Sequence, residues 1–200
     1  MTTTNSKVDS RDRIVAAALE EIRAKGILGL RIADVAVRAG VSQSAIHKFY
    51  RDRDGLLAKV LGDQLREFHE SDSRAIQDYL AENQGMIDPG ELTQFFVHPT
   101  SPERRQRRWL RLQSFAAAAE IPALREELQK SQSEFISTIE NTALEVRRRT
   151  GAIGEFDSRP FAHALAGQLL GLVYNDLISD NVSDEEFFRH MKDYLRRYLS

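Results

Sequence analysis

The chain has 200 residues, of which 42% are hydrophobic and 29% are charged, enough to bury the core of one medium domain or of a small and a larger one. It contains no cysteine, which excludes disulfides, thiolate nucleophiles and zinc sites built on cysteine. The formal net charge of −2 hides an asymmetry, because residues 1–61 carry 11 Lys and Arg against 7 Asp and Glu. A basic N-terminal segment followed by an acidic remainder weakly favours a polyanionic partner for the N-terminal segment.

No segment has the apolar core of a signal peptide or approaches the roughly 20 apolar residues of a membrane span. We therefore expect a cytoplasmic protein without a membrane partner. Residues 1–9 are polar and are predicted to form a disordered tail.

Helix signals recur along the chain, whereas strand-like alternation is scarce. In the first third, helices are predicted over 10–25, with Gly26 as the stop, over 32–39, over 43–50 and from about residue 54. Further on, helix starts are predicted at the caps Asp88, Ser101 and Ser183 and near Pro122 and Pro160. The helix after Pro122 should end near Arg149, the helix after Pro160 near Ser179 and the last helix near Tyr198. The fold class is therefore all-α, with about nine helices.

The segment 32–50 has the spacing of a helix-turn-helix. Ala36 supplies a small residue where the two helices cross, Gly40 tolerates a positive φ in the turn, and Ile46 faces the first helix. Ser42 stands where an N-cap is needed and leaves the next amides free to face a phosphate. An ordinary helix hairpin with a solvated polar face is the alternative.

The run "RIADVAVRAGVSQSAIHKFYRDRDGLL", residues 31–57, resembles the DNA-binding domain of TetR-family transcriptional regulators. The matching positions are Val35, Ala36, Ala39 to Ser42, Ile46, Tyr50 where the family has Phe, Arg53, Asp54 and Leu56. A later run, "IPALREELQKSQSEF", is similar to the family's regulatory domain, more loosely. The resemblance implies an N-terminal three-helix DNA-binding domain at 10–55, joined to a larger helical ligand-binding and dimerisation domain at 56–200.

The resemblance also implies a function. It predicts a homodimeric repressor that binds a palindromic double-stranded DNA operator and is released by a small-molecule inducer. Two departures keep an alternative open, because Arg31 replaces a capping Thr and His47 replaces a phosphate-contacting Tyr. The alternative is an all-α interaction module of the same fold with weakened or lost DNA binding.

Polar side chains on the second helix of the hairpin suit base edges, and the cations around it suit phosphates. We predict that Gln43, Ser44 and His47 read bases. The residues predicted to position the protein on phosphates are Arg31, Ser42, Lys48, Tyr50 and Arg53.

Small residues recur at spacings of three and four near the end of the chain, where they would let a second helix approach closely. The predicted dimer interface comprises Ala164, Gly167 and Gly171 with the apolar residues Leu165, Leu172, Phe187, Met191 and Leu195. The alternative is that these faces pack inside one protomer.

A few polar side chains among aromatic ones are typical of a ligand cavity. The predicted ligand-binding residues are Phe68, Trp109, Gln113, Phe135 and Tyr174, for an effector that is partly apolar or aromatic; core packing is the alternative for each. The basic run 104–111, "RRQRRWLR", is interpreted as a solvated helix face with Trp109 and Leu110 inward, and a second polyanion site is its alternative.

No enzymatic signature is present in the sequence. The five histidines have no zinc-binding spacing, and no glycine-rich loop could cradle a phosphate. We expect no catalysis, no metal site and no cofactor.

Overall fold

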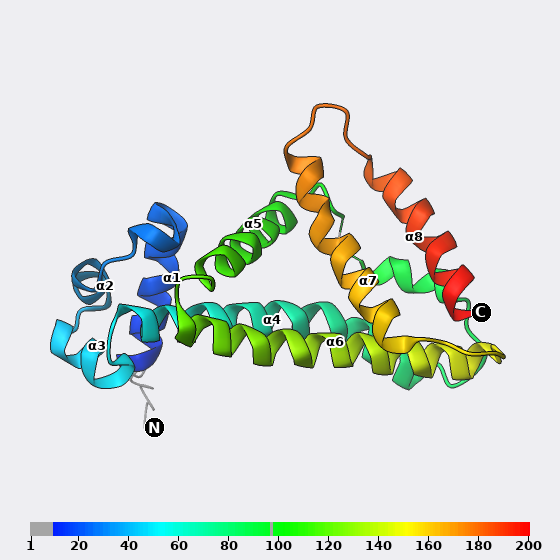
Figure 1. Cartoon of the computed structure of the whole chain (residues 1–200), viewed down its shortest axis with the longest axis horizontal. Coiled ribbons are helices and arrows are strands. Elements are labelled where there is room, and N and C mark those ends of the chain that lie inside the picture. Colours follow the sequence, from blue (N-terminus) through cyan, green and yellow to red (C-terminus); the bar gives the residue numbers. More distant parts are fainter. Residues whose placement is uncertain (1–9, 97) are drawn as a thin grey trace, which may run out of the picture. The chain divides into compact units, whose positions relative to one another are not determined.

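The structure is a computed structural model that describes residues 10–96 and 98–200, and within these residues helices are the only regular secondary structure (Figure 1). The α-helices are α1 (Ser10–Gly29), α2 (Ile32–Ala39), α3 (Gln43–Tyr50), α4 (Arg53–Glu82), α5 (Pro102–Ala117), α6 (Pro122–Thr150), α7 (Ser158–Gly171) and α8 (Asp184–Leu199). Two 3-10 helices, η1 (Pro89–Phe95) and η2 (Leu172–Asp176), complete the set. The all-α prediction is confirmed, and the predicted tail 1–9 lies outside the described residues. No helix in the described ranges is both long and apolar enough to cross a bilayer.

The chain forms two compact units. The first runs to Gln64 and includes Gln113–Gln129; the second comprises Leu65–Leu112 and Lys130–Ser200. Helices α4, α5 and α6 therefore each contribute residues to both units. The boundary predicted from the resemblance, between residues 55 and 56, falls inside α4.

The core of the first unit is built as the helical periodicity predicts. Ile14, Ala18 and Ile22 lie on the buried face of α1, and Ile46 of α3 is fully buried. The predicted stop at Gly26 is a break inside α1, because this residue has a φ of 75° and a ψ of 170°, which only glycine adopts without strain.

The core of the second unit draws on residues from η1 and from four α-helices. Its buried members are Leu80, Leu92, Ala143, Val146, Phe161, Leu165, Phe187, Met191, Leu195 and Leu199. Helix α8 packs along η1, and its N-terminus has the predicted capping box, in which Ser183 and Glu186 bond each other's backbone amides.

Two helices differ from their predicted form. The helix after Asp88 is a 3-10 helix, although Asp88 does cap it by accepting a hydrogen bond from the Gly90 amide. Helix α7 ends at Gly171 and continues as the 3-10 helix η2, short of the end predicted near Ser179. A capping signal marks where a helix begins, but it does not determine the helix type or its length.

Candidate functional site

Helices α2 and α3 form the predicted helix-turn-helix with the predicted bounds. Gly40 ends α2 in the left-handed conformation, with φ 63° and ψ 42°, and its amide bonds the carbonyls of the last turn. Ser42 caps α3, since its hydroxyl accepts a hydrogen bond from the Ala45 amide at 3.2 Å. Ala36 and Ile46 are buried at the crossing, as their sizes predict.

A network of charges joins α2 to α1. The Glu21 carboxylate, with a side chain 3% exposed, pairs with Lys25 at 2.7 Å and with Arg38 of α2 at 2.6 Å. Lys25 also bonds Asp34 of α2 at 2.8 Å, and Arg38 reaches Glu20 at 2.9 Å. These contacts lower the pKa of Glu21, chiefly through the hydrogen bond from Lys25, and they hold the first helix of the hairpin in place.

The outer face of α3 carries four exposed polar side chains at helical spacing: Gln43, Ser44, His47 and Lys48. Gln43 and Lys48 make no hydrogen bond or ion pair with another described residue, so their polar groups are available to a partner. The Ser44 hydroxyl lies 2.8 Å from that of Ser42. Together these groups supply both donors and acceptors, the combination needed to read base edges.

His47 has a defined role for one of its ring nitrogens. Its Nδ1 lies 2.9 Å from the carbonyl oxygen of Arg51, and a carbonyl only accepts, so Nδ1 is the donor. In a neutral ring, Nε2 is then an acceptor on an exposed side chain, suited to an amino group on a base. Protonation converts Nε2 into a donor, suited to a phosphate.

The residues predicted to contact phosphate occupy different environments. Arg31 stands at the N-cap of α2, exposed, and gives that helix no side-chain hydrogen bond. The hydroxyl of Tyr50 donates to the Arg11 carbonyl at 3.5 Å. Arg53 donates to the carbonyls of Leu30 at 3.0 Å and Ile27 at 2.9 Å, so its guanidinium ties the start of α4 to the end of α1.

Two residues of this unit carry roles that the sequence analysis missed. Asp52 caps α4, since its carboxylate accepts a hydrogen bond from the Gly55 amide at 2.8 Å, and this bond lowers the pKa of Asp52. A side chain at Gly55 would place its Cβ 2.1 Å from the Tyr50 carbonyl oxygen, so this position requires glycine. The signal was available in the sequence, as an Asp three residues before a Gly at a helix start.

The second unit contains a cavity of about 160 Å³. Most of its wall is apolar and comes from η1, α4, α6, α7 and α8. The cations of the wall all lie on α5, namely Arg104, Arg107, Arg108 and Arg111, at the spacing of one helix face. Asp72, on α4, is the carboxylate of the lining.

Of the five residues predicted to bind ligand, Phe135 lines this cavity and the other four do not. Phe68 instead packs beneath the guanidinium of Arg107, whose Cζ lies 4.6 Å from the ring centroid. Tyr174 is 69% exposed. Trp109 is half-buried and Gln113 is exposed, the latter in the first unit. Sequence reasoning missed the arginines, because it assigned the run 104–111 to a solvated face.

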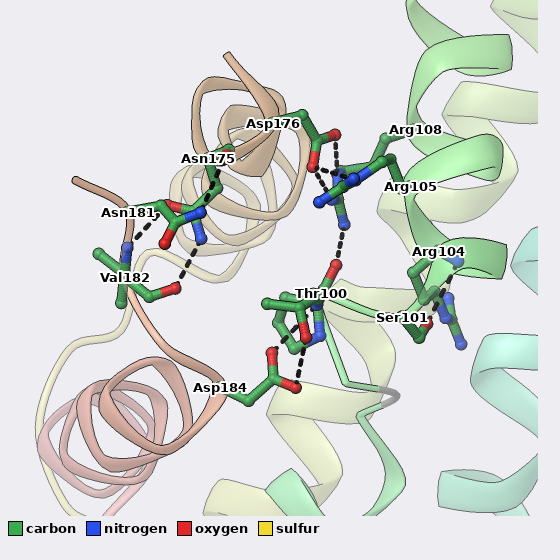
Figure 2. A network of polar contacts seen from close by, with 11 residues as sticks. Thr100, Ser101, Arg104, Arg105, Arg108, Asn175, Asp176, Asn181, Val182 and Asp184 are labelled. Atoms are coloured by element: carbon green, nitrogen blue, oxygen red, sulfur yellow. Dashed lines mark hydrogen bonds and ion pairs between the residues drawn. The ribbon is translucent and has the colours of Figure 1, made fainter. Parts of the chain in front are cut away.

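A polar network fixes the start of α5 within the second unit (Figure 2). Arg108 donates to the Asp176 carboxylate at 2.7 Å and to the Pro99 carbonyl at 2.6 Å, and Arg105 reaches the same carboxylate at 3.1 Å. The Asp184 carboxylate accepts from the amide and the hydroxyl of Thr100, at 3.0 and 2.8 Å. Arg105 and Arg108 thus hold α5 against η2, and Thr100 holds the segment before α5 against the start of α8.

His69 is buried beside the cavity-lining residue Phe135, with the two rings stacked at a centroid distance of 4.0 Å. Neither ring nitrogen has a hydrogen-bond partner among the described residues. Burial, and next the charge of Arg111, lower the pKa of His69 to about 3, so the ring is neutral at physiological pH. Within the described residues, no group of three His, Asp or Glu is arranged to hold a metal.

The residues predicted to form a dimer interface fall into two groups. Ala164 and Gly167 are exposed and Gly171 is half-buried, and a Cβ added to either glycine would meet no atom within 4 Å. The remaining five, Leu165, Leu172, Phe187, Met191 and Leu195, pack in or against the core of the second unit, as the alternative of packing within one protomer predicts.

Comparisons with known proteins agree with this architecture. Residues 14–60 match the sequence profile of the family described as bacterial regulatory proteins, tetR family. A search of curated protein sequences finds no match.

Several solved structures share the fold. A TetR-family transcriptional regulator from Rhodococcus sp. superposes with a TM-score of 0.71 at 24% identity, covering 96% of this chain and 98% of its own. A transcriptional regulator from Saccharomonospora viridis, in complex with choline, gives a TM-score of 0.65 at 21% identity, with coverage of 92% and 94%. The multidrug-binding protein EbrR, complexed with ethidium, gives 0.65 at 25% identity, with coverage of 94% and 99%.

Proposed function

We propose that the protein is a DNA-binding transcriptional regulator that responds to a small molecule, because residues 14–60 match the tetR family's sequence profile and the chain shares its fold with solved regulators. The single observation that carries this proposal is the outer face of α3. Four exposed polar side chains project from a helix that Ser42 caps and that lies within residues 14–60, the segment matched by the family's profile.

The residues divide by the part of DNA that they suit. Gln43, Ser44 and His47 are proposed to read base edges. The residues proposed to hold phosphates are Arg31, Ser42, Lys48, Tyr50 and Arg53. Among the latter, exposure favours Arg31 and Lys48, whereas Arg53 already bonds backbone carbonyls.

We further propose that the protein binds a palindromic operator as a homodimer. A short recognition helix contacts too few bases for useful specificity, and a twofold dimer places two such helices one DNA turn apart. The small residues Ala164 and Gly167, which are exposed, and Gly171, which is half-buried, support an interface through α7, since open space lies over both glycines.

Regulation is proposed to be repression relieved by a ligand in the cavity of the second unit. The complexes of related folds with choline and with ethidium support a ligand in this fold. Helix α4 contributes Leu57 to the first unit and Asp72 to the cavity wall, so one helix takes part in both. If the ligand and DNA favour different states, each weakens the binding of the other by the same factor.

Selection of bound sequences from a randomised DNA pool, with purified full-length protein stripped of ligand, tests the proposal. The expected winner is a palindrome, bound with an affinity that falls by several powers of ten between 50 and 200 mM salt if about 6–10 phosphates are contacted. No enrichment, from protein shown to be folded, would instead favour an interaction module that has lost DNA binding.

A further inference from the structure

The cavity of the second unit is asymmetric in charge. Most of its wall is apolar, with Ser73, Thr138 and Thr142 as the uncharged polar residues of the lining. Its charged residues are the four arginines of α5 and Asp72 of α4. Two of the four are neutralised inside the protein, because Arg108 pairs with Asp176 at 2.7 Å and Arg104 pairs with Asp72 at 2.7 Å.

Arg111 has no such compensation. It makes no hydrogen bond or ion pair with another described residue, and its Nε is buried without a partner. Burial lowers the pKa of Arg111, and the neighbouring charges of Arg104 and Arg107 lower it further, against the opposing effect of Asp72. The Nη1 atom of Arg107 lies 3.6 Å from Oδ1 of Asp72, the same oxygen that pairs with Arg104. The closer partner of Arg107 is Glu103, whose side chain is exposed. The cavity wall therefore carries more positive than negative charge.

A cation buried without a counter-ion is costly to the folded protein, and an anionic ligand removes that cost. A carboxylate is the matching group, because a guanidinium can bind both of its oxygens through parallel hydrogen bonds. A cationic ligand would meet repulsion at the same place.

The volume limits the rest of the ligand. A protein cavity of about 150 Å³ lined by apolar side chains holds benzene. The cavity here has about 160 Å³, and Phe135 and Ile139 are among its apolar walls. A single ring or a short alkyl chain therefore fits it.

We propose that this cavity binds a small amphipathic monocarboxylate, with its carboxylate on Arg111 and its ring or short alkyl chain against the apolar walls. The inference rests on the proposed function, in which this cavity holds the effector. It adds the chemical class of that effector, which differs from the choline and ethidium of the related structures.

The inference is tested by calorimetric titration of the full-length protein without DNA. The ligands titrated are phenylacetate, hexanoate and the uncharged amide of each. Both acids are expected to bind at least tenfold more tightly than their amides. The variant Arg111→Met keeps an apolar stem of similar length, and it should weaken acid binding by at least tenfold while leaving the amides unchanged. Arg189→Met, a loss of the same charge from an exposed residue of α8 that does not line the cavity, should change neither.

Arg111→Lys retains the charge and should keep acid binding within a few-fold, which provides a second variant should Arg111→Met fail to fold. Equal binding of acid and amide, or no binding of either acid at millimolar concentration by folded protein, would overturn the inference. The DNA selection is independent of these titrations. If the protein selects an operator but binds neither acid, only the proposed class of ligand is contradicted. If it binds the acids but selects no DNA sequence, only the proposed function as a DNA-binding regulator is contradicted.

Discussion

Arg108 and Asp176 form an ion pair of 2.7 Å in which the side chains are only 8% and 3% exposed. The pair joins α5 to η2, and the Pro99 carbonyl takes a further guanidinium hydrogen. Buried pairs of this kind are costly to break, because the remaining charge is left in a medium that solvates it poorly.

Asp176→Leu should therefore lower the free energy of unfolding by about 3–5 kcal/mol, the usual cost of removing one partner of a buried pair. The double variant Arg108→Met, Asp176→Leu should recover most of that loss, since no charge of the pair is then stranded. Urea unfolding of the three proteins measures both effects. Additive losses in the double variant would show that the two residues are not coupled.

The second prediction concerns the pH dependence of stability through His69. Its folded pKa of about 3 lies below the unfolded value near 6.5, so between these values the unfolded chain binds the proton and the folded chain does not. Stability should fall as the pH is lowered through this window, by about 2 kcal/mol between pH 7 and pH 5.

The matched variant is His69→Phe, which keeps an aromatic ring stacked on Phe135 but cannot bind a proton. This variant should lack the part of the pH dependence that His69 causes. At pH 7 its free energy of unfolding should be about 1–3 kcal/mol higher, because two buried nitrogens without hydrogen-bond partners are removed. The carboxylates Asp88 and Glu145, each with a pKa of about 2, lose their stabilising interactions only below about pH 4. Equal slopes for the two proteins from pH 7 to 5 would contradict the assignment to His69.

The third prediction separates base reading from phosphate binding on α3. Gln43→Ala should reduce affinity for the selected operator while leaving affinity for unrelated DNA unchanged, with about 1–3 kcal/mol of discrimination lost. Lys48→Ala should weaken binding to all DNA sequences alike. It should also reduce by about one the slope of the logarithm of affinity against the logarithm of salt concentration. Affinities measured over a salt series on operator and scrambled DNA distinguish the two. The control for loss of charge is Arg189→Ala, at an exposed position of α8. An equal loss of affinity for operator and scrambled DNA in Gln43→Ala would show that Gln43 does not read bases.

The fourth prediction concerns the open space over α7. A side chain at Gly167 meets no atom of the protomer within 4 Å, so Gly167→Ala and Gly167→Leu should both fold. If a second α7 packs there, Leu should dissociate the dimer and Ala should weaken it less. Sedimentation velocity across a concentration series reports the mass. An unchanged dimer with Leu would place the interface elsewhere.

How far the sequence predicts this structure depends on whether the determining interactions are local. The bounds of α2 and α3 follow from Gly40 and Ser42, whose turn and cap act within a few residues, and both helices were predicted correctly. The DNA-reading candidates are exposed for the same local reason, since Ile46 fixes which face of α3 is buried.

The cavity could not be predicted in this way, because the rotation of α5 about its axis depends on distant residues. Hydrophobicity favours an inward Trp109, yet the buried side of α5 carries Arg108, whose partner Asp176 lies 68 residues further along the chain. Sequence periodicity cannot distinguish a solvated arginine from one neutralised by a remote carboxylate. Of the five predicted ligand residues, Phe135 lines the cavity, whereas the two on α5, Trp109 and Gln113, do not.

Asp72 gives the cavity a built-in competitor. Its carboxylate already satisfies Arg104 and approaches Arg107, as a bound acid would satisfy Arg111. A ligand carboxylate that enters the cavity would compete with Asp72 for the arginines. Asp72 would then pair with a different arginine or lose its ion pairs. Because Asp72 belongs to α4, the charge of an effector, and not only its bulk, would then be felt by the helix that also carries Leu57 in the first unit. A neutral molecule of identical shape would fill the space but would leave the ion pairs of Asp72 unchanged.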